Sequence, residues 1–156
     1  MTTKKKVSSK KRAPRKKTVA TKAAKKKAST AVTGKSAGKD FTAVFNALRG
    51  ILTPYEGSLS PRERDPGYFY LESLEPTYKN RPMFFAGVKA EKNYITYHLL
   101  PVYTNPELNQ KISPALKKRM QGKACFNFAV IDPPLFRELG ALTKSGYKVF
   151  KDRGWL

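Results

Sequence analysis

Positive charge is distributed very unevenly along this chain. The segment KKKVSSKKRAPRKKTVATKAAKKKAS, residues 4–29, contains no acidic and no aromatic residue. Residues 1–39 hold 13 Lys and 2 Arg and no acid, a net charge of +15, whereas residues 40–156 hold 17 Lys plus Arg against 11 acids, a net charge of +6. All 9 Phe, all 8 Tyr and the single Trp lie in the second part. A segment so poor in apolar residues cannot offset its ordering entropy, so we expect residues 1–39 to be a disordered tail and residues 40–156 to form one domain.

The composition of the tail predicts contact with a polyanion. A flexible polycation gains affinity for DNA or RNA by releasing condensed counterions, and this affinity depends strongly on salt. With no aromatic residue and only two Arg, the tail offers no stacking platform and little base readout, so we expect non-specific binding. The alternative is a tail that only keeps the protein soluble. The basic side chains expected to contact nucleic acid are Lys4, Lys5, Lys6, Lys10, Lys11, Arg12, Arg15, Lys16, Lys17, Lys22, Lys25, Lys26 and Lys27.

Other features of the sequence limit the classes of protein to consider. The only cysteine, Cys125, allows no intramolecular disulfide, which is typical of a reducing compartment. No apolar run reaches the length of about 18 residues that a membrane span needs, and no apolar segment of a secretory signal follows the basic N-terminus. The segment GKSAGKD, residues 34–40, lacks the spacing of a phosphate-binding loop and is interpreted as a hinge. We therefore expect a cytoplasmic protein without a membrane partner, with association with the bacterial nucleoid as a further expectation.

Two stretches of residues 40–156 have the spacing of amphipathic helices. Asp40 is placed as an N-cap before apolar residues at helical intervals, and Pro54 ends that pattern. Near the C-terminus Asp132 is placed as an N-cap, with Pro133 in the first turn and Gly146 as the glycine that follows the helix. One or two short helices are expected between residues 100 and 122, with Ser113 as N-cap and Pro114 in the first helical position.

Between these helices the apolar period changes to that of strands. Residues 67–73, 83–90, 93–100 and 123–130 are rich in aromatic and β-branched residues and are predicted as strands. Phe84, Ala86 and Val88 are predicted to share one face of the second strand. The third strand is apolar on both faces and is predicted to be central. Residues 55–67 are predicted as an exposed loop. The fold class is α+β: an antiparallel sheet of four or five strands, flanked by an N-terminal and a C-terminal helix.

Three segments carry a resemblance to a known family. MFFAGVKAEKNYITYHLLPVY, ISPALKKRMQGKACFNF and LFRELGALTKSGYKVF, which lie within residues 68–150, resemble the YdhG-like family of small bacterial proteins, a domain family of unknown function. That family is similar in fold to the frataxin-like α+β proteins, and the resemblance implies the same architecture here. The tail resembles the lysine-rich tails of linker histones in composition. Some frataxin-like proteins deliver iron, which leaves an iron carrier as one functional alternative.

The residues themselves do not provide an obvious metal site or catalytic site. The first predicted helix has one acid, Asp40, where a frataxin-type protein has an acidic ridge, and the other acids are scattered along the chain. The sequence contains none of the CxxC, HxxE or HExxH patterns of metal sites and no nucleophile elbow. His98 and Cys125 could form a nucleophile pair, but packing roles for both are favoured. We expect no metal, no cofactor and no enzymatic activity.

Aromatic and basic residues of the domain provide the remaining candidates for a site. Tyr68 and other tyrosines could line a cleft that binds a base or a small anion, and a basic segment could extend the charge of the tail onto the domain. The opposing interpretations are strand packing and a solvated helix surface. The candidates for this pocket or basic patch are Tyr70, Arg81, Tyr94, Tyr97, His98, Lys117, Lys118, Arg119, Lys123 and Asn127. The leading hypothesis is a non-enzymatic binding protein that associates with DNA or RNA through its tail; a module for a small ligand or a protein partner is the alternative.

Overall fold

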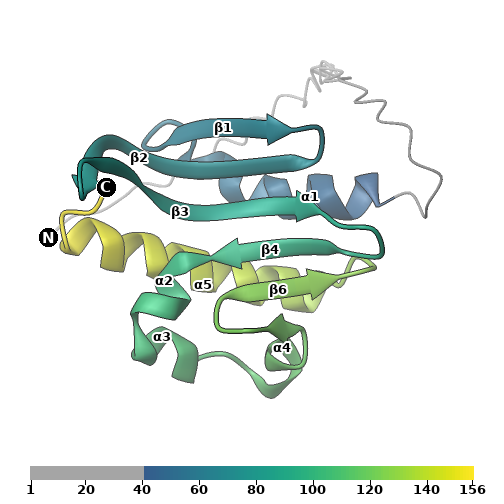
Figure 1. The fold of residues 1–156 in the computed structure, drawn as a ribbon. Helices are drawn as coiled ribbons and strands as arrows, with labels where there is room; N and C mark the ends of the chain where they lie inside the picture. Colours follow the sequence, from purple (N-terminus) through teal and green to yellow (C-terminus); the bar gives the residue numbers. More distant parts are fainter. Residues whose placement is uncertain (1–40) are drawn as a thin grey trace, which may run out of the picture. The chain divides into compact units, whose positions relative to one another are not determined.

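An antiparallel sheet with helices against one face organises residues 41–156, the part of the chain that the computed structural model describes (Figure 1). The predicted α+β class is therefore confirmed. The predictions for the lysine-rich tail and for the hinge lie outside the described residues. The prediction of Asp40 as an N-cap is wrong, because the helix at Thr42–Leu52 has Phe41 as its N-cap and no side-chain cap hydrogen bond.

The sheet has six strands in the order β1-β2-β3-β4-β6-β5, and every neighbouring pair is antiparallel. β4 lies between β3 and β6, which confirms the prediction of a central strand. The strands are β1 (Ser60–Asp65), β2 (Tyr68–Tyr78), β3 (Arg81–Ala90), β4 (Ile95–Leu99), β5 (Met120–Gln121) and β6 (Cys125–Phe128).

Two of these strands were missed by the sequence prediction. The prediction of an exposed loop over residues 55–67 is wrong, because β1 pairs with β2 along that stretch. Its sequence SPRERD is polar at nearly every position and exposed along most of its length, so no alternation of apolar and polar residues marks it as a strand. β5 is only two residues long, too short for a periodic pattern to be recognised.

Helices pack against a single face of the sheet. α1 (Thr42–Leu52) contacts β3 and β4 and continues into the short 3-10 helix η1 (Thr53–Tyr55), and α5 (Pro133–Asp152) packs beside α1. Three short helices connect β4 to β5: α2 (Leu100–Thr104), α3 (Pro106–Gln110) and α4 (Pro114–Lys117). In the view of Figure 1, α1 and α5 lie behind the sheet.

Side-chain caps begin the helices at two of the predicted places. The Ser113 hydroxyl accepts a hydrogen bond from the Leu116 N–H, and the Asp132 carboxylate accepts one from the Leu135 N–H. Each cap satisfies a backbone donor that lacks a partner within the first helical turn. Both N-cap predictions are confirmed, and the proline that follows each cap starts the helix with a favourable φ.

The prediction that Gly146 ends the last helix is wrong. α5 continues to Asp152, and Gly146 lies buried inside it. A Cβ at this position would lie 2.7 Å from the Pro101 Cβ of α2. The glycine therefore allows α5 and α2 to approach closely, a requirement of tertiary packing that looks the same in the sequence as a terminal glycine.

The hydrophobic core lies between the sheet and its helices. Leu48 and Leu52 of α1 and Leu139 of α5 are fully buried there. A buried polar contact between the sheet and α5 joins the hydroxyl groups of Tyr97 and Thr143 at 2.8 Å, and the Thr143 hydroxyl also donates to the Leu139 carbonyl oxygen at 2.8 Å. A buried hydroxyl without such partners would be costly. Across residues 41–156, no helix is both long and apolar enough to span a membrane.

Candidate functional site

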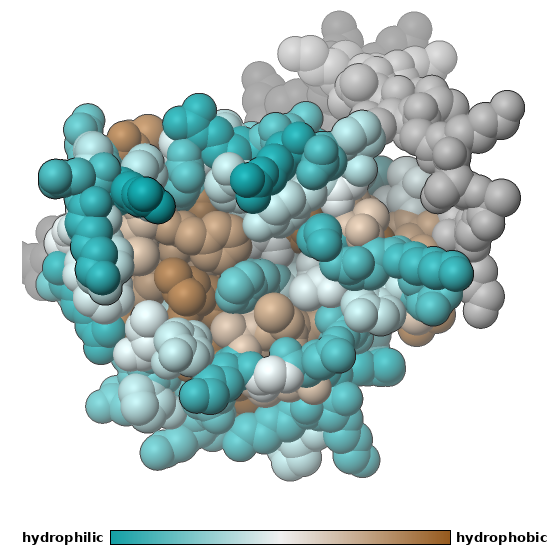
Figure 2. Space-filling model, viewed as in Figure 1, coloured by the Kyte–Doolittle hydropathy of each residue, from teal (hydrophilic) through white to brown (hydrophobic). Residues whose placement is uncertain are grey.

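The two faces of the sheet are very different. Burial alternates residue by residue along the first six residues of β2 and along β4 and β6, so one side of each strand is buried there and the other is partly exposed. The buried side contacts α1 and α5. No helix of residues 41–156 covers the other side, which we call the open face. Figure 2, viewed onto this face, shows apolar residues gathered over the middle of the sheet and surrounded by hydrophilic ones.

A continuous row of rings crosses the open face. The ring centroids of Tyr68 and Tyr70 lie 5.1 Å apart, those of Tyr70 and Phe84 lie 5.9 Å apart, and those of Phe84 and His98 lie 4.9 Å apart. The four residues come from β2, β3 and β4, and all are partly exposed. Each neighbouring pair is tilted by 30° to 40°. We call these four side chains the aromatic strip.

A β-bulge places Phe84 in the aromatic strip. Leu71 pairs with Ala86, whereas Glu72 pairs with Phe84, so Phe85 is an extra residue in β3. The extra residue turns Phe84 toward the open face and Phe85 into the core, where it meets Phe150. The prediction that Phe84 shares a face with Ala86 and Val88 is therefore wrong, because strict alternation does not hold across a bulge.

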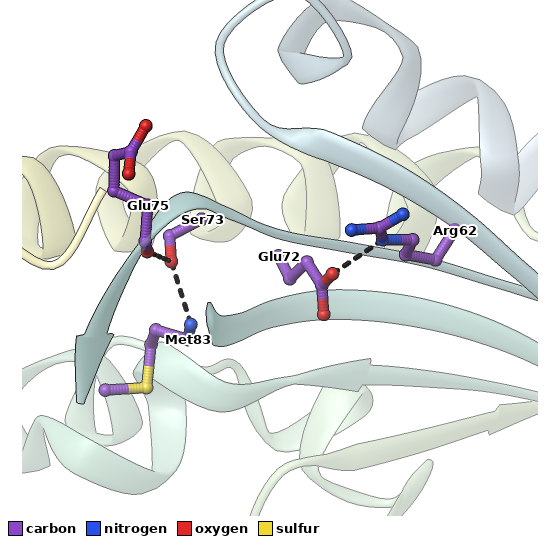
Figure 3. A network of polar contacts seen from close by, with 5 residues as sticks. All are labelled: Arg62, Glu72, Ser73, Glu75 and Met83. Carbon is purple, nitrogen blue, oxygen red and sulfur yellow. Dashed lines mark hydrogen bonds and ion pairs between the residues drawn. The ribbon is translucent and has the colours of Figure 1, made fainter. Parts of the chain in front are cut away.

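Ser73 stabilises the irregular part of the β2–β3 pair beyond this bulge. Its buried hydroxyl accepts a hydrogen bond of 2.8 Å from the Met83 N–H and donates one of 2.6 Å to the Glu75 carbonyl oxygen (Figure 3). These bonds satisfy backbone groups where the strand pairing is shifted. The side chain thus supports the local backbone from which Phe84 projects.

Gly87 provides the room that the strip occupies. It lies in the cross-strand row between Tyr70 and His98. A Cβ at this position would lie 2.8 Å from the Tyr70 Cβ and 3.3 Å from the Phe84 ring. Because Gly87 has no side chain, the Phe84 ring can lie over it and bridge the rings on β2 and β4.

Two acidic groups near the strip, Glu72 and Glu91, are paired with basic side chains, whereas Asp65, the cross-strand partner of Tyr68, forms no ion pair within residues 41–156. The Arg62 Nε lies 2.6 Å from a Glu72 carboxylate oxygen, and the Lys89 Nζ lies 2.7 Å from a Glu91 carboxylate oxygen. Figure 3 shows the first ion pair, between Arg62 and Glu72. Glu72 pairs across the strands with Phe84, and Arg62 pairs with Tyr70, so this ion pair lies beside the strip. The basic side chain of each pair is exposed, so these pairs contribute little to stability, but they neutralise the carboxylates of Glu72 and Glu91.

Burial changes the acid–base behaviour of three side chains on the open face. It raises the pKa of the Tyr68 hydroxyl, a shift that the neighbouring Tyr70 increases and that nearby Arg64 and Lys89 oppose. Burial lowers the pKa of His98, so its imidazole is neutral at pH 7. Burial also raises the pKa of Cys125, which keeps it a thiol.

The structure brings some of the predicted pocket residues together and separates others. Tyr70 and His98 are part of the aromatic strip. Asn127 lies on the same face, where its amide oxygen accepts from Thr96 at 3.0 Å and its amide nitrogen donates to Gln121 at 2.7 Å. Tyr97 lies on the opposite face and is completely buried, so it cannot line a site with the other tyrosines.

The remaining candidates lie away from the strip. Arg81 is exposed at the start of β3, and Tyr94 is partly buried just before β4. Lys118 and Arg119 border an open hollow of about 530 Å³ near the start of α5, where Arg119 lies 3.8 Å from the Asp132 carboxylate. Lys117 is exposed in the last turn of α4.

Lys123 borders a second and smaller hollow, of about 320 Å³, and its Nζ lies 5.4 Å from the centroid of the Tyr103 ring. The predicted basic residues therefore do not line one site: Lys118 and Arg119 border one hollow and Lys123 borders another.

His98 and Cys125 are cross-strand partners on the open face. Their pKa shifts keep an imidazole and a thiol in the neutral form, whereas a nucleophile pair of this type needs a thiolate. Within residues 41–156 no group of three or more His, Cys, Asp or Glu side chains could hold a metal ion.

The sequence predicted Tyr70 and His98 as site residues and indicated Tyr68, but it did not predict Phe84. The signal that could have found it is the pair of adjacent phenylalanines followed closely by a glycine within one strand, which is typical of a bulge.

No family model, no curated protein and no solved structure was found to match this chain. The resemblance to the YdhG-like family, and the iron delivery that it raises as an alternative, stay predictions.

Proposed function

We propose that this chain is a non-enzymatic nucleic-acid-binding protein that associates with DNA or RNA through its lysine-rich segment. The observation that carries the proposal is the charge of residues 1–39, which hold 15 basic residues and no acidic one. Residues 41–156 add 17 basic residues against 10 acidic ones, so the domain does not oppose the approach of a polyanion. Affinity of this kind comes from counterion release and needs no sequence-specific contact.

The test compares the full chain with a chain that begins at Asp40. Fluorescence anisotropy measures binding to a labelled duplex from about 50 to about 200 mM salt. We expect the full chain to bind with a steep salt dependence, in which each neutralised phosphate adds about 0.9 to the log–log slope, and the shorter chain to bind much more weakly. The shorter chain contains all the residues of the hydrophobic core, so a difference in binding between the two chains reports on the removed segment.

Two results would contradict the proposal. One is equal duplex affinity of the two chains, which would assign binding to the domain alone. The other is the absence of duplex binding by the full chain at low salt. A matched control replaces Lys10, Lys11, Lys16 and Lys17 by Gln in the full chain; the salt slope should fall while the domain remains unchanged.

A further inference from the structure

We propose that the aromatic strip is a stacking site for unpaired bases, so that the nucleic acid bound by this protein is single-stranded where it meets the domain. This inference rests on the proposed function, because it names the form of nucleic acid that the domain accepts. Four properties of the open face support it: its rings, their support by the backbone, its charge and its hydrogen-bonding groups.

The rings form a platform of the kind that bases stack on. Stacking needs partly exposed aromatic faces arranged in sequence, and antiparallel sheets that bind single-stranded RNA present such rings on their open side. The aromatic strip has four rings in continuous contact, with centroid separations of 4.9 to 5.9 Å. They span three neighbouring strands, so a bound chain can lie across the sheet.

The sheet supports the strip in a fixed place. The bulge at Phe85 turns Phe84 outward, and Gly87 leaves the space over which its ring lies. A platform held by strand pairing and by a missing side chain loses little freedom when a ligand binds, which favours affinity.

The charges around the strip favour a polyanion over a neutral apolar partner. Arg64 and Lys89 lie close enough to Tyr68 to oppose the rise of its pKa. Lys89 is already paired with Glu91, so among residues 41–156 Arg64 is the cation at this end of the strip that no ion pair engages. The carboxylates of Glu72 and Glu91 are neutralised by ion pairs. The backbone phosphates of a bound strand would therefore meet positive charge at the margin of the rings.

Polar groups beside the rings match the edges of bases. The neutral imidazole of His98 offers one donor and one acceptor. The Asn127 amide on the same face bonds Thr96 and Gln121 and keeps a second N–H of its amide nitrogen as a donor. A purely hydrophobic protein interface would not need these groups. Bases in a duplex are stacked on each other and cannot reach the strip, so the site selects unpaired bases.

The first experiment measures binding of the full chain to a labelled oligothymidine of about 15 nucleotides and to a duplex of the same length. Tyr70→Leu removes one ring, and Tyr70→Phe keeps it. Tyr103→Leu removes an exposed tyrosine of α2 outside the strip and serves as the control. We expect Tyr70→Leu to weaken oligothymidine binding roughly 10-fold, with duplex binding unchanged and with both other variants close to the original chain.

A second measurement uses the chain without any change to the sheet. His98 is the only histidine, so its imidazole proton signals in an NMR spectrum are assigned without ambiguity. We expect these signals to shift when oligothymidine is added, because stacked bases alter the ring currents at the strip, and to stay in place when the duplex is added.

The inference is overturned if the His98 signals do not respond to oligothymidine, or if a folded Tyr70→Leu chain binds it as tightly as the original. Either result leaves the proposed function intact as long as duplex binding still depends on the lysine-rich segment. Loss of that dependence, with the strip still responding to oligothymidine, would instead contradict the proposed function alone.

Discussion

Both faces of the sheet carry aromatic side chains, but those on one face are buried and those on the other are partly exposed to solvent. Phe69, Phe126, Phe128 and Tyr97 on the covered face are each exposed by no more than 1%. The aromatic strip on the open face remains partly exposed. The difference arises from α1 and α5, which give the first group packing partners and leave the second group without any. Removing aromatic surface from water is favourable, so an aromatic row left in water is a feature of binding surfaces more than of folding.

The comparison assigns stability to one face and recognition to the other. Aromatic residues of the covered face contact one another and the helices, as Phe128 does with Phe136 in an edge-to-face pair 5.0 Å apart. Those of the open face contact one another only within the sheet. Substitutions on the two faces should therefore affect different measurements.

The largest expected effect comes from truncating the covered face. Phe126→Ala should lower the free energy of unfolding by about 3–5 kcal/mol, because it leaves a cavity in the core. Tyr70→Leu on the open face should cost less than about 1 kcal/mol, as surface substitutions usually do. Urea unfolding measures both values. Equal losses would show that the open face is as important for stability as the core, and the distinction between the faces would fail.

An intermediate effect is expected at Gly87, where the strip meets the strand pairing. In Gly87→Ala the new Cβ would lie 2.8 Å from the Tyr70 Cβ and 3.0 Å from the Phe69 carbonyl oxygen, and the backbone has to shift. We expect a loss of about 1–3 kcal/mol in the free energy of unfolding. The His98 ring signals should also move, because Phe84 lies against both Gly87 and His98.

Gly140→Ala in α5 is the matched control for this substitution. Its Cβ would meet only an Ile51 methyl group at 3.8 Å, an ordinary contact, and alanine is the better helix former. This change should be neutral or stabilising by up to about 1 kcal/mol. A loss at Gly140 as large as the loss at Gly87 would contradict the steric explanation.

The elements that the sequence predicted correctly are those determined locally. The caps at Ser113 and Asp132 depend on one side chain and the backbone three residues later, and the alternation in β4 is visible in five residues. Each of these signals is contained within a single turn or strand, so the surrounding structure does not alter it.

The errors came from features that depend on tertiary contacts. Gly146 reads as a helix end in the sequence, but Pro101 packs against it. Phe84 departs from the alternation of Ala86 and Val88 because a bulge, which exists only in the pairing of β2 with β3, adds Phe85 between Phe84 and Ala86.

The same reasoning explains the candidate site. Tyr70 and His98 were identifiable as strand aromatics, and alternation within β4 places the adjacent Tyr97 on the face opposite His98. Which of these two faces is covered could not be read from the alternation. One face of the sheet is uncovered because α1 and α5 both pack on the other face. The residue pattern of a single strand does not indicate where those helices pack.

The smallest expected effect concerns the pH dependence of stability. Burial on the open face lowers the folded-state pKa of His98 below the value of 6.5 that it has when exposed. Between these two pKa values the unfolded chain binds more protons than the folded one, so the free energy of unfolding rises with pH. As the pH falls from about 7.5 to about 5.5, the histidine should therefore destabilise the fold.

His98→Phe keeps a ring in the strip and removes this titration. Thermal unfolding of both chains across the same pH range isolates the contribution of the imidazole, because no other histidine is present. The variant should lose less stability on acidification than the original chain. An identical pH dependence would mean that the open face leaves His98 as hydrated as an unfolded chain does, and the strip would then be more exposed than its ring contacts indicate.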